Sequence, residues 1–102
     1  MSAPVSIQGY HHATLTVSNI ERSREFYSDL LGLNVIAELS PTRYVLSNGQ
    51  LILAISEPPD PSQAPDEDRF NENRVGLDHV SFAVESRQEM DRAKKLLTEA
   101  GV

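Results

Sequence analysis

Residues 12–17, with the sequence HATLTV, recur as residues 79–84, with the sequence HVSFAV. Every position of the first copy maps onto the position 67 residues later, 12 onto 79 and 17 onto 84. In both copies a histidine opens a six-residue strand pattern. A unit repeated in this way indicates a module that was doubled, and a doubled module that carries a histidine can bring two imidazoles together.

A helix start follows each copy of this strand. After the first copy, Ser18 is the expected N-cap and Glu21 completes a capping box, which predicts a helix over residues 19–31 that is closed by a glycine. After the second copy, a capping-type start at Ser86 predicts a helix over residues 87–100. Strand and helix are thus repeated together.

Three further strands are predicted between the two copies. We expect them over residues 34–39, 42–47 and 51–55, and an Asn-Gly pair provides a hairpin turn between the last two. The strand over residues 51–55 is apolar on both faces, so we expect it in the middle of the sheet.

These elements predict an α+β fold with a half-open mixed sheet. One βαβββ module spans about residues 10–56, and a proline-rich linker over residues 57–76 follows it. The first strand (77–84) and the helix of a second module occupy about residues 77–102. The repeat then lacks three strands, so we expect residues 1–102 to form a single domain that is incomplete at its C-terminus.

Length and composition limit the possible functions. A chain of 102 residues forms one domain at most. Its net charge of −6 and its scattered basic residues argue against a nucleic-acid partner. Without cysteine it has neither a disulfide framework nor a thiol catalyst. The sequence shows no secretory signal and no membrane-spanning run, so we expect a cytoplasmic protein without a membrane partner.

The candidate metal ligands are His12 and His79. Each shares its strand face with small or polar residues, which indicates a wet or ligand-filled surface. Neutral imidazoles are common ligands of divalent metals, and two of them with a carboxylate leave positions open for a bound oxygen. A lone strand histidine is more often an ordinary hydrogen-bonded residue, and it is the repetition that favours the pair. His11 has Asp78 at its place in the second copy, and we interpret it as structural or exposed.

A third ligand, Glu or Asp, is expected on the last strand of a module. Residues 50–56 contain no carboxylate. Glu57 follows directly, but it is a weak candidate because two prolines come next. The corresponding strand of the second module would lie beyond Val102, and we expect the third ligand there.

Residues 11–33 (HHATLTVSNIERSREFYSDLLGL) resemble the opening of the vicinal oxygen chelate superfamily, above all in the motif FYxxLLG at residues 26–32. Residues 74–84 resemble the start of its second module. The superfamily includes glyoxalase I, bleomycin-resistance proteins, fosfomycin-resistance thiol transferases and extradiol dioxygenases. The resemblance implies glyoxalase-like, paired βαβββ modules around a divalent metal, with ligands at the positions of His12 and His79.

The resemblance also implies an activity. A glutamate that binds metal in glyoxalase I falls at Ala54 here, which makes glyoxalase I itself less favoured. In the thiol transferases and dioxygenases, the carboxylate comes instead from the last strand of the second module. We therefore expect a metal-dependent lyase, isomerase, thiol transferase or dioxygenase that uses Zn, Ni, Mn, Fe or Co and acts on a small, oxygen-rich substrate.

Two alternatives stay open. One is a metal-free, dimeric protein of the bleomycin-resistance type that binds or sequesters a small molecule. The other takes residues 1–102 as an inactive fragment of a longer enzyme. The strand predicted over residues 77–84 would have unsatisfied edges, so we expect a homodimer or a swapped assembly.

Overall fold

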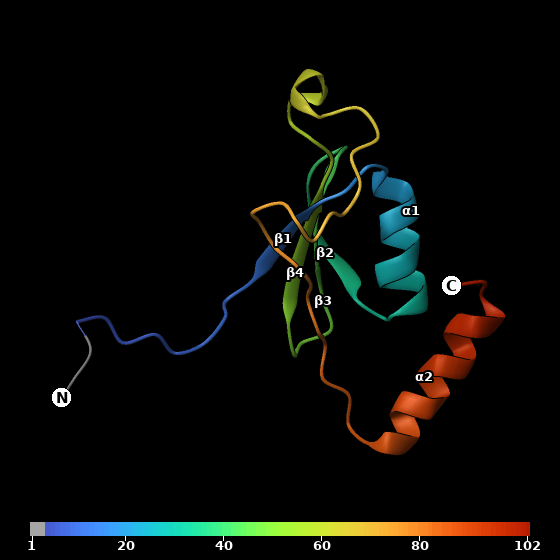
Figure 1. Ribbon diagram of the computed structural model, residues 1–102. Helices are drawn as coiled ribbons and strands as arrows, with labels where there is room; N and C mark the ends of the chain where they lie inside the picture. Colours follow the sequence, from blue (N-terminus) through green and yellow to red (C-terminus); the bar gives the residue numbers. More distant parts are fainter. Residues whose placement is uncertain (1–3) are drawn as a thin grey trace. The chain divides into compact units, whose positions relative to one another are not determined.

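The computed structural model describes residues 4–102, which form two compact units, one reaching to Ala64 and one spanning Pro65–Val102 (Figure 1). The first unit holds β1 (Ala13–Thr16), α1 (Ile20–Arg24), the π-helical segment η1 (Glu25–Leu30), β2 (Asn34–Ser40), β3 (Arg43–Ser47), β4 (Ile52–Ser56) and the short 3-10 helix η2 (Pro61–Gln63). The second unit holds α2 (Arg87–Glu99). This order confirms the predicted α+β class and the βαβββ succession.

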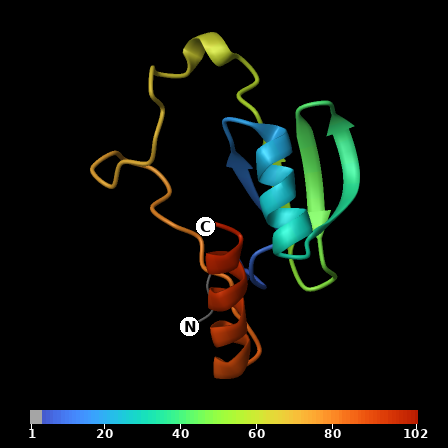
Figure 2. The same cartoon turned by 90° about the vertical axis from the view of Figure 1, so that its right-hand side faces the viewer.

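The four strands form one mixed sheet in the order β1-β4-β3-β2. β1 runs parallel to β4, while β3 is antiparallel to both β4 and β2. α1 and η1 run as one continuous helix across one face of this sheet (Figure 2). β4 lies between two neighbours, and its residues Leu53, Ala54 and Ile55 are buried, as predicted for an apolar central strand.

The hydrophobic core lies between the sheet and the helix. Leu46, Leu53 and Ile55 are fully buried there, and Ile20 of α1 packs into the same cluster. The three strand residues alternate with residues on the opposite face, so the core receives every second side chain of β3 and β4. Burial of each of these side chains contributes about 1.5–3 kcal/mol to the free energy of unfolding.

The N-cap of α1 is Asn19, so the predicted cap at Ser18 is wrong by one residue. Asn19 has extended backbone angles (φ −147°, ψ 108°), and its side chain accepts a hydrogen bond from the backbone N–H of Arg22 at 3.0 Å. An amide oxygen caps as well as a hydroxyl, and here the chain turns into the helix one residue later than expected. The predicted capping box is absent because Glu21 bonds to side chains instead.

Helical structure continues from Ile20 to Leu30, within the predicted range of residues 19–31. Its second half is wound as a π-helix, in which the N–H of Leu31 bonds to the carbonyl of Phe26, five residues earlier. Gly32 then adopts a positive φ of 78°, as expected of a residue that closes a helix. A π-helical segment of six residues changes the spacing of apolar residues along the helix too little to be recognised in the sequence.

The turn between β3 and β4 is built as the Asn-Gly pair predicted. The side chain of Asn48 accepts hydrogen bonds from the N–H groups of Gln50 (2.9 Å) and Leu51 (3.3 Å). Gly49 has a φ of 87°, which favours glycine. The turn sets the register in which Ser47 pairs with Ile52.

The strand predicted over residues 77–84 is wrong: this segment has no regular secondary structure. Its apolar side chains Val80, Phe82 and Val84 are 40%, 38% and 42% exposed, so they do not point into a core as expected. A strand exists only where its N–H and C=O groups pair with another backbone, and no strand in residues 4–102 pairs with this one.

The helix of the second unit is close to its predicted range of residues 87–100. Ser86 caps it by accepting a hydrogen bond from the N–H of Glu89 at 3.1 Å. Arg92 and Glu89 form an ion pair along its exposed surface at 2.6 Å. Within the described residues, no helix combines the length and apolar character that crossing a membrane requires.

Candidate metal centre

The face of the sheet opposite the helix carries small or polar side chains of β1 and β4, next to Val45 of β3. Thr14 of β1 pairs with Ala54 of β4, and Ala54 pairs with Val45 of β3. Thr16 pairs with Ser56 in the next rung. Partner residues in a ladder share a face, so these side chains all lie away from the helix. This is the face on which the sequence predicts the first metal ligand.

His12 lies directly before β1, which begins at Ala13, one residue later than the predicted strand. Its side chain is exposed. Its Nδ1 lies 2.8 Å from Nδ1 of His11, and the two rings meet edge to face with centroids 5.1 Å apart. One of these nitrogens carries the proton and the other accepts it. Within residues 4–102, Nε2 of His12 makes no hydrogen bond.

His79 has a similar contact in the second unit. Its Nδ1 lies 2.7 Å from Oδ1 of Asp78, and the two side chains are 75% and 65% exposed. The described residues place no hydrogen-bond partner at Nε2 of His79. Both predicted ligands are thus held at Nδ1 by the side chain of the preceding residue. Their Nε2 atoms are available to a ligand.

The contacts of His11 and Asp78 with the two candidate ligands were not predicted. The repeat places His11 and Asp78 at equivalent positions, but the sequence indicated only a structural or exposed role for His11. Because the chain is not yet in a strand at His11, its ring reaches the next imidazole instead. A polar residue directly before each repeated histidine was the available signal.

The two candidate ligands belong to different units, His12 to the first and His79 to the second. Their convergence on one cation therefore stays a prediction. Residues 4–102 contain no group of three or more His, Cys, Asp or Glu side chains arranged to hold a metal ion. Two histidines alone do not form such a group.

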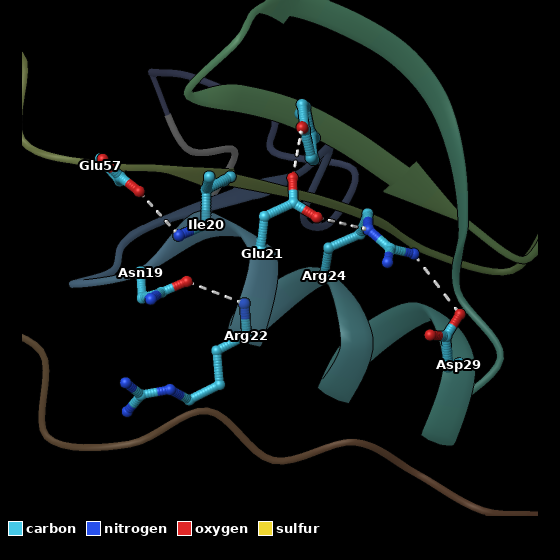
Figure 3. Close-up of polar contacts among 8 residues, drawn as sticks. Asn19, Ile20, Glu21, Arg22, Arg24, Asp29 and Glu57 are labelled. Carbon is cyan, nitrogen blue, oxygen red and sulfur yellow. Dashed lines mark hydrogen bonds and ion pairs between the residues drawn. The ribbon is translucent and has the colours of Figure 1, made fainter.

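Glu57, the weak candidate for a third ligand, is engaged at the start of the helix. Its Oε2 accepts a hydrogen bond from the backbone N–H of Ile20 at 2.8 Å (Figure 3). Its own N–H bonds to the carbonyl of Thr42 at 3.0 Å. The contact with Ile20 directs the carboxylate toward the helix side of the sheet, whereas Thr14 lies on the other side. Glu57 is therefore better placed to stabilise α1 than to bind a metal at the opposite face.

A second polar cluster joins the helix to the sheet. The hydroxyl of Tyr44 donates a hydrogen bond to Glu21 at 3.0 Å, and Arg24 donates to the other oxygen of the same carboxylate at 3.4 Å. Arg24 also lies 3.5 Å from Asp29, as Figure 3 shows. The hydrogen bond to Glu21, followed by burial, raises the pKa of Tyr44 above its usual value. The cluster links α1 to β3 and contains none of the predicted ligands.

Relatives of known sequence include a metallothiol transferase. Over 82 residues the chain is 33% identical to the metallothiol transferase FosB of Staphylococcus saprophyticus, a match that covers 80% of this chain and 49% of that protein. The FosB of Staphylococcus haemolyticus is 41% identical over 51 residues, which are 50% of this chain and 36% of the relative. The chain thus spans about half the length, or less, of the curated relatives that it matches.

Solved structures share the fold. The glyoxylase/bleomycin resistance protein/dioxygenase domain from Frankia sp. EAN1pec superposes with a TM-score of 0.78 at 30% identity, over 94% of this chain and 71% of that one. A lactoylglutathione lyase from Agrobacterium tumefaciens gives a TM-score of 0.69 at 20% identity, over 93% and 71% of the two chains, a likeness of fold alone.

The profile of one protein family matches almost the whole sequence, from residue 9 to residue 102. The match includes both copies of the histidine-led segment and the helix that follows each. It agrees with the resemblance seen in residues 11–33 and with the mixed sheet. The chain belongs to the Glyoxalase/Bleomycin resistance protein/Dioxygenase superfamily.

Proposed function

We propose that this chain contributes His12 and His79 to a divalent-metal centre of a metal-dependent enzyme, of the thiol transferase or lyase type. The observation that carries the proposal is the shared geometry of the two imidazoles. Each is exposed, each is held at Nδ1 by its preceding side chain, and each has Nε2 available. Histidines that bind metals commonly have their second ring nitrogen anchored in this way.

The donor set suits a borderline divalent cation. Neutral imidazole nitrogens bind Zn, Ni, Fe or Co readily, and two of them leave room for a carboxylate and for substrate oxygens. We expect the carboxylate from the last strand of the second module. When bound, the metal would polarise substrate oxygens and stabilise negative charge that develops on them. The small and polar side chains opposite the helix, such as Thr14 and Thr16, would line the substrate side.

Within the superfamily, a thiol transferase is favoured over glyoxalase I. Ala54 occupies the place of the first-module metal ligand of glyoxalase I, and no carboxylate of β4 can replace it. The carboxylate of Glu57 already accepts a hydrogen bond from the backbone N–H of Ile20. The sequence similarity to a protein named metallothiol transferase also supports a thiol transferase. The substrate class would be a small molecule with neighbouring oxygen atoms.

Metal content of the protein at full length tests this proposal. After chelation and dialysis, zinc or cobalt chloride is added and bound metal is measured by elemental analysis. We expect stoichiometric metal in the wild type and its loss in the double variant H12A/H79A. Glu72→Ala, which removes an exposed carboxylate, is the matched control and should retain the metal. Stoichiometric metal in the double variant would refute the assignment of the ligands.

The alternative is a metal-free binding protein of the bleomycin-resistance type. The absence of a carboxylate from β4 favours it, while the two retained histidines oppose it. The same titration separates the two functions. A wild-type protein that takes up neither zinc nor cobalt would support the metal-free alternative.

A further inference from the structure

We infer that His11 and Asp78 are positioning residues that hold Nδ1 of His12 and of His79, so that each imidazole can present the lone pair of Nε2 to a cation. The inference deepens the proposed function and rests on it. The two contacts, 2.8 Å from Nδ1 to Nδ1 and 2.7 Å from Nδ1 to Oδ1, occur at equivalent places of the repeat.

The contact with Asp78 favours one tautomer of His79. An ionised carboxylate has no proton to donate and only accepts hydrogen bonds. The contact at 2.7 Å therefore favours the tautomer in which Nδ1 of His79 carries the proton. In a neutral imidazole, Nε2 is then the unprotonated nitrogen, which is the form that binds a metal. The contact with Asp78 thus favours the metal-binding form of this ring in the absence of metal.

His11 acts differently, because an imidazole can both donate and accept. If His12 donates through Nδ1, its Nε2 keeps a lone pair and His11 must carry its own proton on Nε2. In the opposite arrangement His12 holds its proton on Nε2 and cannot bind a metal there. A cation at Nε2 of His12 thus selects one of two arrangements of the pair. The contact with Asp78 thus favours the metal-binding tautomer of His79, whereas the contact with His11 permits two tautomers of His12.

Neither positioning residue is required by the fold. His11 and Asp78 are exposed, lie outside the regular elements and take no part in the hydrophobic core. Their contacts join neighbours in the chain, and surface contacts of this kind contribute little to stability. Their replacement should leave the protein folded, so effects on metal binding can be separated from effects on folding.

Nitrogen NMR of the imidazole rings, in protein at full length without metal, tests the tautomers directly. We expect His79 to carry its proton on Nδ1 in the wild type, and a mixture of both tautomers in Asp78→Ala. Asp78→Asn keeps an acceptor oxygen and should restore the wild-type form in part. Asp66→Ala, which removes an exposed carboxylate of the same unit, should change nothing. Identical ring spectra in wild type and Asp78→Ala would overturn the inference.

Titration with zinc chloride tests the consequence for binding. Asp78→Ala and His11→Ala should each weaken zinc binding about tenfold, the lower end of the effect known for residues that orient metal-bound histidines. Unchanged zinc affinity in both variants would overturn the positioning role. If the wild type binds no zinc, or if H12A/H79A binds it as tightly as the wild type, the proposed function fails instead. The ring spectra of the metal-free protein still report the tautomers in that case.

Discussion

The carboxylate of Glu57 bonds to the backbone N–H of Ile20 at 2.8 Å, although the two residues are 37 positions apart in the chain. The bond ties the end of β4 to the first turn of α1. Backbone N–H groups in the first turn of a helix have no partner within the helix, and a negative charge there also favours the helix dipole. The contact thus adds to the cap by Asn19 at the start of the helix and to the bond of Tyr44 with Glu21 that joins the helix to the sheet.

Replacing Glu57 by Ala should therefore lower stability without removing metal. We expect the free energy of unfolding to fall by about 0.5–2 kcal/mol, as for the loss of other N-terminal helix caps. Urea denaturation gives this value, and zinc titration gives the second readout. Glu72→Ala is the control, since Glu72 is exposed and lies in the linker. Loss of zinc binding in Glu57→Ala would instead identify Glu57 as a ligand.

The cap of α1 can be tested by two neighbouring substitutions. Asn19→Ala should cost about 1 kcal/mol because it removes the acceptor for the N–H of Arg22. Ser18→Ala should leave stability nearly unchanged, since the hydroxyl of Ser18 caps nothing in this structure. Urea denaturation of both variants decides between the two positions. A larger loss in Ser18→Ala would restore the cap that the sequence predicted.

Burial of β4 predicts a larger effect. Leu53→Ala should lower the free energy of unfolding by about 2–5 kcal/mol, because it opens a cavity among Leu46, Ile55 and the helix. Leu39→Ala is the matched control, since Leu39 on β2 is 62% exposed. Denaturation curves that shift equally in the two variants would contradict the assigned core.

Tyr44 predicts a dependence of stability on alkaline pH. Its pKa is raised by the hydrogen bond to Glu21 and by burial, so folding favours the protonated phenol. The stabilisation is present below the pKa of the unfolded tyrosine, about 10, and is lost as pH rises through the higher pKa of the folded state. We expect this loss in the wild type and a weaker one in Tyr44→Phe. The free energy of unfolding of both proteins is measured between neutral and alkaline pH. Parallel curves for the wild type and Tyr44→Phe would contradict the assignment.

Local signals in the sequence predicted most of the first unit and the helix of the second. The Asn48-Gly49 turn, the closing Gly32 and the cap Ser86 each depend on neighbours in the chain, and each is found as expected. The hydrogen bond between Ile20 and Glu57 joins residues that are distant in the sequence, so no local pattern predicts it. The strand expected over residues 77–84 was wrong for a related reason, because the pattern shows strand propensity but not whether a partner backbone is present.

The same distinction applies to the candidate site. The repeat identified His12 and His79 as equivalent, since equivalence can be read from spacing alone. Their contacts with His11 and Asp78 depend on where a strand begins and how a side chain turns. Whether the two imidazoles meet at one cation depends on the arrangement of two units, which spacing does not determine.

The segment over residues 77–84 predicts association between copies of the chain. Its unpaired backbone and its exposed Val80, Phe82 and Val84 are features that promote pairing with another strand. Light scattering of this 102-residue chain should show a dimer or larger assembly, and Phe82→Asp should shift it toward the monomer. Val75→Asp, at a fully exposed position before the segment, is the control and should leave the assembly unchanged. A wild-type chain that stays a monodisperse monomer at high concentration would exclude this mode of pairing.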